Sequence, residues 1–454
     1  MLAISGLDDF VFGKAPYPVS AGRGLVIGGG EVVPELNFTL PPIDIIDANW
    51  PEVRDQYVEM IGAVCERAVS IGTPSLLVEF ETLPPMTIRP AWGLEIAKIL
   101  SEALHKTNDK YGIKTALRLT PNDSRDHIGR PPIMRSGIYL EGMVEFFRKA
   151  GTVGADFLSI ESTGGKEICD TALMNGDLRT LLFALGVLAP RDMRFLWGEI
   201  VAACNENGVV PAGDSACGYA NTAMVLAEQK LLPRVFAAVV RVASVPRSLV
   251  AYEMGAVGPS KDCAYEGPYM KAIAGVPISM EGRSAACAHL SPVGNISQAV
   301  CDCWSNESVQ NVRLLSASAP VVSLEQLVYD CRLMRAAANS GGAGTLRDWL
   351  ADSDASLDPQ AHVLRPDVVL KLSAEIVAEK TPYLRTRRAV LATVQELRRA
   401  KSAGEVSIET REAAWLDKLE RTVNELPEAE DEFVAEMKVE LKDEPWLPSE
   451  YGLS

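Results

Sequence analysis

Helical and strand-like segments alternate along the chain from about residue 50 to about residue 280, and this alternation restricts the possible folds most. Residues 51–71 carry apolar side chains at helical spacing, and Asn49 marks the start of this helix. Residues 75–81 follow with the composition of a strand. Strands that are separated by helices pair in parallel, because the crossover helix returns the chain to the same end of the sheet. The sequence therefore predicts an α/β fold.

The same pattern repeats along this region. Further helices are expected at 91–111, at 137–150, in two segments that end near 207, and at 221–228. Further strands are expected at 113–119, 155–161, 208–212 and 234–243, with shorter ones at 256–258 and 276–279. About eight strand–helix units in about 280 residues is the size of a (β/α)8 barrel of the TIM type. An open doubly wound sheet is the alternative, although these strand ends lack its phosphate-binding loop.

The two ends of the chain differ from this middle region. The N-terminal residues are rich in Gly and Pro, and the run Gly28–Gly30 is interpreted as part of a hairpin, because the residues after it are extended rather than helical. After about Pro320 the chain is helical and strongly charged. We therefore expect three parts: a β-rich N-terminal extension at 1–48, the barrel at 49–325, and a C-terminal helical region at 326–454.

The charge of the chain argues against several classes of partner. The 454 residues carry a net charge of −16, and the densest basic cluster, around Arg387, is surrounded by acids. Phosphate backbones and anionic lipids repel such a chain, so we expect no binding to nucleic acid or to membranes. The N-terminal residues lack the pattern of a secretory signal, and the longest uncharged stretch, 284–301, contains polar residues and Pro. We expect a cytoplasmic protein.

Cysteine and histidine usage narrows the kinds of metal site. Nine cysteines, an odd number, argue against a disulfide scaffold and for reduced thiols that are buried or bound to metal. The four histidines are widely separated: His105, His127, His289 and His362. A metal site here is therefore expected to use thiolates and carboxylates.

Polar residues at strand ends indicate where chemistry would lie. Glu79 and Glu81 alternate with apolar residues in one expected strand, and Glu161 ends another. A parallel strand that is buried on both faces is nearly all apolar, so these residues suggest a face that lines a barrel mouth. The turn after Glu161 has two interpretations: an anion-binding turn, or a loop in which Thr163 caps a helix.

Two further strand ends carry a cysteine in a Gly-rich loop. The first, 212–218, differs by one residue from the nucleophile elbow G-x-S-x-G, because Cys217 replaces the last glycine after Ser215. A serine hydrolase is a weaker alternative, since few histidines are present to act as base. The second loop, 258–263, ends at Cys263.

Glu161, Cys217 and Cys263 thus end three expected strands and could converge at one mouth. Two thiolates and a carboxylate suit Zn²⁺, and three protein ligands leave one position open, as in catalytic sites. Other thiols compete with this set: Cys287 with His289, Cys301 with Cys303, and Cys169. Cys65, Cys204 and Cys331 have helical surroundings and are interpreted as core residues.

Long segments resemble one family, the methanol-specific methyltransferase subunit of methanol:corrinoid methyltransferases. The matching segments include 159–167, 185–193, 216–228, 233–242, 261–268, 275–283, 285–296 and 304–311. The similarity covers nearly the whole chain, and the C-terminal helical part diverges more.

The resemblance implies a (β/α)8 barrel with one zinc ion per chain, bound by Glu161, Cys217 and Cys263. It also implies a separate corrinoid-carrying subunit as partner and a catalytic subunit that pairs with itself. Zinc would polarise the oxygen of methanol as a Lewis acid, and the cob(I)amide of the partner would attack the methyl carbon. Alternatives are another small methyl donor, a zinc hydrolase with Glu81 or Asp214 as base, and an inactive scaffold.

Other charged residues also lie near the expected strand ends. Four carboxylates are candidates for a proton donor or for support of the ligands: Glu79, Glu81, Asp214 and Asp262. Four more charged residues are expected to form internal ion pairs: Arg118, Arg241, Glu281 and Arg283.

Overall fold

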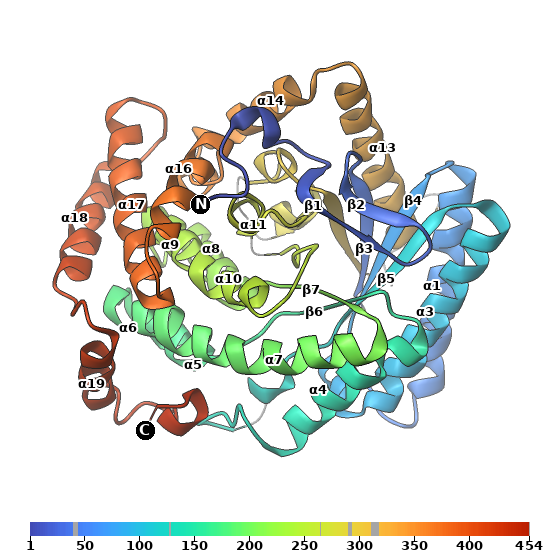
Figure 1. The fold of residues 1–454 in the computed structure, drawn as a ribbon, viewed down its shortest axis with the longest axis horizontal. Coiled ribbons are helices and arrows are strands. Elements are labelled where there is room, and N and C mark those ends of the chain that lie inside the picture. Colours follow the sequence, from blue (N-terminus) through green and yellow to red (C-terminus); the bar gives the residue numbers. More distant parts are fainter. Residues whose placement is uncertain (40–43, 127–128, 264, 289–292, 310–316, 454) are drawn as a thin grey trace.

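The computed structural model describes residues 1–39, 44–126, 129–263, 265–288, 293–309 and 317–453. Its centre is a curled, parallel sheet of seven strands (Figure 1). The strands lie in the order β7 (Val210–Asp214), β6 (Phe157–Ile160), β5 (Lys114–Thr120), β4 (Ser75–Glu81), β3 (Val33–Thr39), β9 (Cys303–Val309) and β8 (Ser279–Glu281). The expected α/β class is confirmed.

Two strands were not expected to belong to this sheet. β3 lies within the N-terminal 48 residues and pairs with β4 on one side and β9 on the other. The polar residues Glu35 and Asn37 alternate along β3, and β9 is similarly polar, which hid the strand pattern. The sheet therefore begins before residue 49, whereas the division of the chain at residues 48 and 325 stays a prediction.

Residues 257–260 link the two edge strands, β7 and β8. Val257 and Gly258 donate backbone hydrogen bonds of 2.8 Å to carbonyl groups of β7. Ser260 donates one of 3.1 Å to the carbonyl of Pro277, which precedes β8. This segment has no strand geometry of its own among the described residues, so a closed eight-stranded barrel stays a prediction.

Helices surround the sheet, and the helices expected up to residue 228 are present (Figure 1). Prolines lie in the first turn of many of them, where a missing N–H costs nothing. Their bounds are α1 Trp50–Ser70, α2 Pro84–Ile88, α3 Pro90–Tyr111, α4 Gly137–Lys149, α5 Lys166–Asn175, α6 Leu178–Phe183, α7 Ala189–Asn207, α8 Thr222–Glu228, α10 Val245–Glu253, α11 Gly267–Ala274 and α12 Arg283–Ala288.

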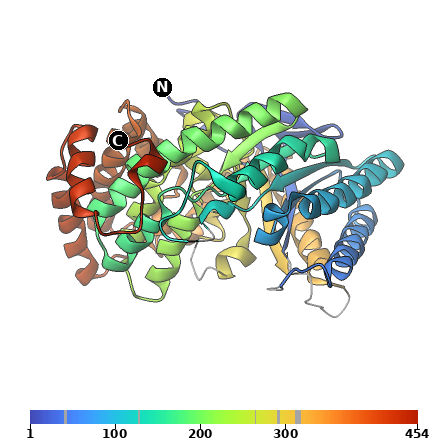
Figure 2. The same cartoon turned by 90° about the horizontal axis from the view of Figure 1, so that it is seen from below.

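The C-terminal part is helical, as expected. Figure 2 shows the last helices gathered at one side of the molecule. The bounds are α13 Ala319–Asn339, α14 Ala343–Ala355, α15 Pro359–His362, α16 Pro366–Val377, α17 Pro382–Ser402, α18 Thr410–Asn424 and α19 Glu430–Glu440. α13 packs against β3 and β9, so it belongs to the helices that cover the sheet.

The segment 234–243 is helix α9 (Arg234–Ala243), so the expected strand is wrong. Every residue from Val235 to Ala243 is buried, because α9 packs between α8, α15 and α17. All of these residues except Arg241 are apolar, and a short, largely apolar run of this kind cannot be distinguished from a buried strand by its pattern alone. The stretch Arg234–Glu253 is long and apolar enough to cross a membrane, but 94% of its most apolar window is buried inside the protein.

An antiparallel hairpin precedes the sheet. It is formed by β1 (Lys14–Ala21) and β2 (Leu25–Gly29), so the turn lies before the Gly run rather than within it. Gly28 has φ +81°, and a Cβ there would lie 2.8 Å from the Cβ of Ala15. Glycine is therefore required at this position of β2, where the strand passes close to Ala15.

Candidate metal centre

Three side chains meet at the C-terminal end of the sheet. Glu161 directly follows β6, Cys217 begins a wide helical turn after β7, and Cys263 follows the segment that links the edge strands. Their ligand atoms, one carboxylate oxygen and two sulfurs, lie within 4.8 Å of one another. The structure thus brings together the three residues that the sequence pattern singled out. Single wide helical turns are frequent at functional sites.

Direct contacts connect the three side chains and two neighbours. Sγ of Cys263 lies 2.6 Å from Oε1 of Glu161 and 3.5 Å from Oγ of Ser215. Nδ2 of Asn221 lies 3.6 Å from Sγ of Cys217 and donates to the carbonyl of Cys263. Cys263 is buried, Cys217 is half-buried, and the Glu161 side chain is 27% exposed. The centre is therefore partly exposed, at Glu161 and Cys217.

The two thiols have raised pKa values. The hydrogen bond with Cys263 lowers the pKa of Cys217, but burial and the charge of Glu161 outweigh it and raise this pKa to about 11. Burial raises the pKa of Cys263 well above its usual range. A metal ion that binds here must replace both protons, because the thiolate is the ligand.

Lys261 places one positive charge among three carboxylates. Its Nζ lies 3.3 Å from Oε1 of Glu161, 3.3 Å from Oε1 of Glu79 and 2.6 Å from Oδ1 of Asp262, and its side chain is 1% exposed. Burial raises the pKa of Asp262, but Lys261 and a hydrogen bond from Ser305 lower it below its usual value. Asp262 is therefore ionised and pairs with Lys261.

Glu79 and Glu81 lie on the inner face of β4 beside this cluster. Glu79 accepts a hydrogen bond from Thr120, and Oε2 of Glu81 accepts one from Asn37 at 3.2 Å. Burial raises the pKa of Glu79 to about 7 and that of Glu81 to about 8. Both carboxyl groups therefore exchange protons near neutral pH.

Asp214 occupies a different environment. Its Oδ1 accepts hydrogen bonds from Arg247 (3.0 Å) and from the backbone N–H groups of Ser162 and Ser215, and its Oδ2 accepts one from Trp197 (2.8 Å). Both oxygens are thus occupied by donors in the protein interior. Asp214 joins the loops after β6 and β7 and is not free to act as an acid or a base.

The residues expected to form internal ion pairs differ from one another. Arg118 is fully buried, and its Nε lies 2.8 Å from Oε1 of Glu35. The expectation is wrong for Arg283, which begins α12 outside the sheet, is 44% exposed and pairs with Asp330 at 2.6 Å. Two more of these residues are buried beside the ring of Tyr265: Arg241 and Glu281.

The profile of the family "Methanol-cobalamin methyltransferase B subunit" (MtaB) matches residues 1–452. The chain belongs to this family. It is 36% identical over 457 residues to the methanol–corrinoid protein co-methyltransferase of Methanosarcina barkeri (strain Fusaro / DSM 804), covering 99% of this chain and 98% of that protein. The crystal structure of the methanol:cobalamin methyltransferase complex MtaBC from Methanosarcina barkeri matches with a TM-score of 0.95 and 36% identity, over 100% of this chain and 99% of that chain. The resemblance inferred from the sequence motifs is confirmed.

One other group of potential metal ligands occurs in the described part of this B subunit homologue: His362, Glu396 and Glu405. Nε2 of His362 lies 3.1 Å from Glu396, which also binds Lys371 at 2.5 Å and Arg399 at 2.6 Å. The carboxylate of Glu396 is therefore already paired with two cationic side chains. This group is an ion-pair network rather than a cation site.

The remaining thiols lie elsewhere. Cys287 is exposed, and its expected companion His289 lies outside the described residues. The other cysteines are buried: Cys65, Cys169, Cys204, Cys301, Cys303 and Cys331.

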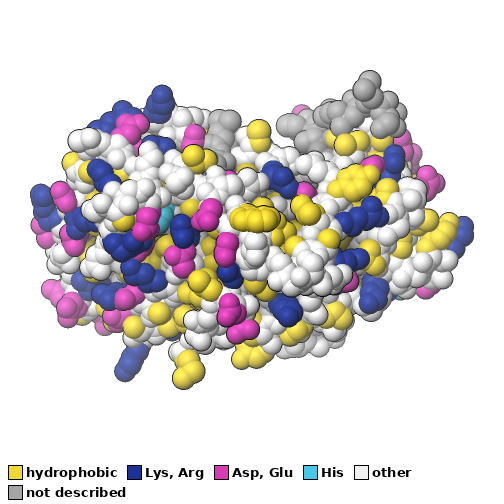
Figure 3. Space-filling view, turned by 90° about the horizontal axis from the view of Figure 1, so that it is seen from above, with side chains coloured by type: hydrophobic (Ala, Val, Ile, Leu, Met, Phe, Trp, Pro, Cys, Tyr) yellow, Lys and Arg dark blue, Asp and Glu magenta, His cyan; other side chains and the backbone are white. Residues whose placement is uncertain are grey.

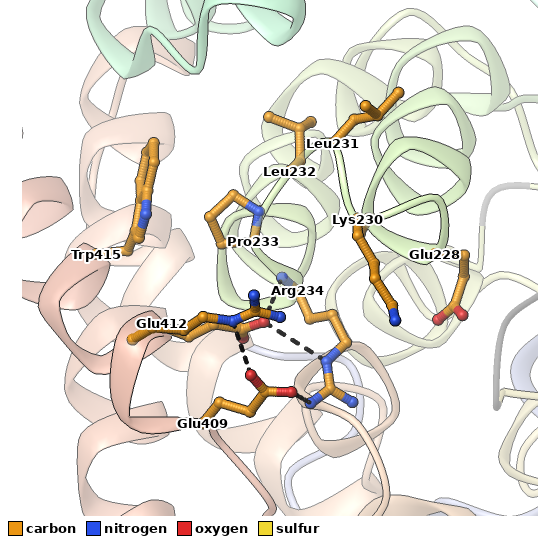
Figure 4. Close-up of a pocket in the computed structure, with 11 residues that line it drawn as sticks. Glu228, Lys230, Leu231, Leu232, Pro233, Arg234, Glu409, Glu412 and Trp415 are labelled. Carbon is orange, nitrogen blue, oxygen red and sulfur yellow. Dashed lines mark hydrogen bonds and ion pairs between the residues drawn. The ribbon is translucent and has the colours of Figure 1, made fainter.

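A groove of about 460 Å³ lies between the turn after α8 and the start of α18 (Figure 4). Trp415 and Pro233 contribute apolar walls, and Arg234 lies 3.6 Å from Glu412 and 4.0 Å from Glu409. The candidate ligands do not line this groove. Figure 3 shows that acidic, basic and hydrophobic side chains are also interspersed on the face of the molecule seen from above.

Sequence reasoning missed three side chains around the centre. Lys261 could have been found, because it precedes Cys263 by two residues in a loop already singled out. Asn221 follows Cys217 by four residues, which places both on one face of a helical turn. Asn37 could not be found without recognising β3.

Proposed function

We propose that this chain transfers the methyl group of methanol to the cob(I)amide cofactor of a separate corrinoid protein, using a zinc ion bound by Glu161, Cys217 and Cys263. The observation that carries the proposal is the meeting of one carboxylate and two thiols at the C-terminal end of the sheet, in a member of the B subunit family. The relative from Methanosarcina barkeri is named a methanol–corrinoid protein co-methyltransferase.

The donor set fits zinc. Zn²⁺ binds thiolates and carboxylates in a tetrahedron with bonds of about 2.0–2.3 Å, and three atoms within 4.8 Å of one another can share one such ion. Three protein ligands leave one position open, which is typical of catalytic sites. When bound, zinc would supply a Lewis acid for the oxygen of methanol. One ion per chain is expected.

The reaction consumes a proton. The electron pair of cobalt(I) forms the Co–C bond, the C–O bond breaks with its electron pair on oxygen, and cobalt becomes cobalt(III). Hydroxide is a poor leaving group, so the oxygen takes up a proton and leaves as water. General acid catalysis of this kind contributes about 10²–10⁴-fold. The chain must therefore offer a proton near the methanol oxygen.

Of the four carboxylates predicted as proton donors, Glu81 is the one best suited to offer this proton. It ends β4 at the level of the centre, and burial raises its pKa to about 8, so it holds a proton at neutral pH. Glu79 and Asp262 are ion-paired with Lys261, and Asp214 is fully hydrogen-bonded. These three residues support the centre.

The methyl acceptor belongs to a partner, so the corrinoid must approach the open side of the centre. We infer that the chain also pairs with itself in the larger complex and works in the cytoplasm. We infer further that residues 257–260 close the sheet into a (β/α)8 barrel, since they bind the edge strands on both sides.

An anaerobic reaction with CD3OH and cob(I)alamin tests this function. The zinc-loaded protein should form methylcobalamin that carries CD3, detected by its visible spectrum and by mass spectrometry, and Cys263→Ser should not. Methylation from another small donor but not from methanol, in the presence of a corrinoid protein, would contradict the assignment of methanol. Amide hydrolysis without methyl transfer would point to a zinc hydrolase.

A further inference from the structure

Each of the four residues that follow Glu161 forms a hydrogen bond with a buried side chain. This loop leads from the candidate ligand to α5, and two of its residues are glycines. Glycines have no side chain to pack, so hydrogen bonds from outside must define such a loop. Residues at or just after the ends of neighbouring strands form hydrogen bonds with the first three: Asp214 with Ser162, Asp123 with Thr163, and Tyr219 with Gly164.

The fourth residue, Gly165, is held by the far end of the chain. Its N–H donates to Oη of Tyr451 at 3.0 Å, and this hydroxyl donates to Oε1 of Glu167 at 2.7 Å. Tyr451 is 1% exposed. Bulk water therefore does not reach the hydroxyl, which joins the loop to the first turn of α5.

The C-terminal segment that carries Tyr451 is itself fixed. Oε2 of Glu450 accepts hydrogen bonds of 2.8 Å from the backbone N–H groups of Met134 and Arg135. The Tyr451 ring packs against Trp446, with 6.4 Å between centroids. Figure 1 shows this segment, in red, returning from α19 toward α5 and α7.

We propose that Tyr451 is a positioning residue for Glu161: its hydroxyl fixes the Gly-Gly loop and thereby the orientation of the carboxylate at the metal centre. This inference rests on the proposed zinc site and goes beyond it, because it assigns a role in that site to the last residues of the chain. Metal ligands must be held to within about 0.5 Å of their productive geometry, and residues behind the ligands provide this.

Tyr451→Phe tests the proposal, because it removes the hydroxyl and keeps the ring. The matched control is Tyr383→Phe. Tyr383 is equally buried in the same aromatic group, and its hydroxyl donates to the carbonyl of Pro427 at 2.6 Å, away from the loop. Zinc affinity is measured by competition with a chromophoric chelator, and amide hydrogen exchange of residues 161–167 is followed in the zinc-free proteins.

We expect Tyr451→Phe to bind zinc about tenfold more weakly and to exchange faster at 161–167, while Tyr383→Phe resembles the wild type in both measurements. Unchanged zinc affinity in Tyr451→Phe, or an equal loss in both variants, would overturn the proposal. If the wild type binds no zinc, the proposed function fails on its own. Faster exchange confined to 161–167 in Tyr451→Phe would then still support the positioning of the loop, and unchanged exchange would refute it.

Discussion

The ammonium group of Lys261 lies 3.3 Å from the carboxylate of Glu161 in the interior of the protein. It also contacts Glu79 and Asp262, so one cation serves three carboxylates. Two thiolates, one carboxylate and Zn²⁺ would together carry a charge of −1, and Lys261 offsets this charge. A buried charge that loses its partner is strongly destabilising, which makes Lys261 a structural requirement of the centre.

We expect Lys261→Met to lower the free energy of unfolding by about 3 kcal/mol and to weaken zinc binding, because it leaves buried carboxylates unpaired. Chemical denaturation and zinc competition measure the two effects. Lys149→Met is the control, since Lys149 pairs with Glu145 on the surface and should contribute at most about 1 kcal/mol. Equal stability of the two variants would contradict this role of Lys261.

We expect Glu81→Gln to lower the rate of methyl transfer by about 10²-fold or more, because the amide cannot supply the proton. Zinc content should stay unchanged, since Glu81 is not a proposed ligand. The measurement is the rate of methylcobalamin formation together with the metal content of the same sample. A variant with full turnover would remove Glu81 as the proton donor.

Glu167 should make stability depend on pH. Burial raises its pKa in the folded protein to about 7, above the ordinary value of 4.5. The folded state therefore binds this proton more tightly than the unfolded state does. The protonated carboxyl group stabilises the folded state fully at pH 4.5 and below, and this stabilisation is lost as the pH rises through 7. The titration of Glu167 should lower the free energy of unfolding of the wild type between pH 5 and pH 8. In Glu167→Gln this contribution is absent, so we expect its decrease over this pH range to be smaller by about 2–3 kcal/mol. The exposed control Glu145→Gln should keep the wild-type dependence, and an unchanged dependence in Glu167→Gln would refute the assignment.

The sequence predicted the parts of the site that lie at strand ends. Glu161 directly follows β6, Cys217 lies three residues after β7, and Cys263 lies three residues after the segment that links the edge strands. The C-terminal ends of parallel strands meet at one edge of a sheet. Polar residues in otherwise apolar strands indicated these positions. The long-range partners could not be predicted, because Tyr451 lies 286 residues from Gly165 and no local sequence pattern indicates such a contact.

The errors in the fold have a related cause. α9 is a central buried helix in which eight of the nine residues from Val235 to Ala243 are apolar, and it therefore looked like a strand. β3 lies in the segment that was expected to be β-rich, but it has polar inward residues because Glu35 pairs with Arg118 in the interior, and it was therefore not assigned to the central sheet. Both departures from the usual patterns arise from tertiary contacts.

The most direct test of the central claim is zinc K-edge X-ray absorption on the purified protein, with the metal content measured on the same sample. The account predicts one zinc per chain, bound by two sulfurs and by oxygen, and the loss of one sulfur or of the zinc itself in Cys263→Ser. A protein without zinc, a zinc bound by histidine nitrogen, or an unchanged sulfur count in Cys263→Ser would contradict it.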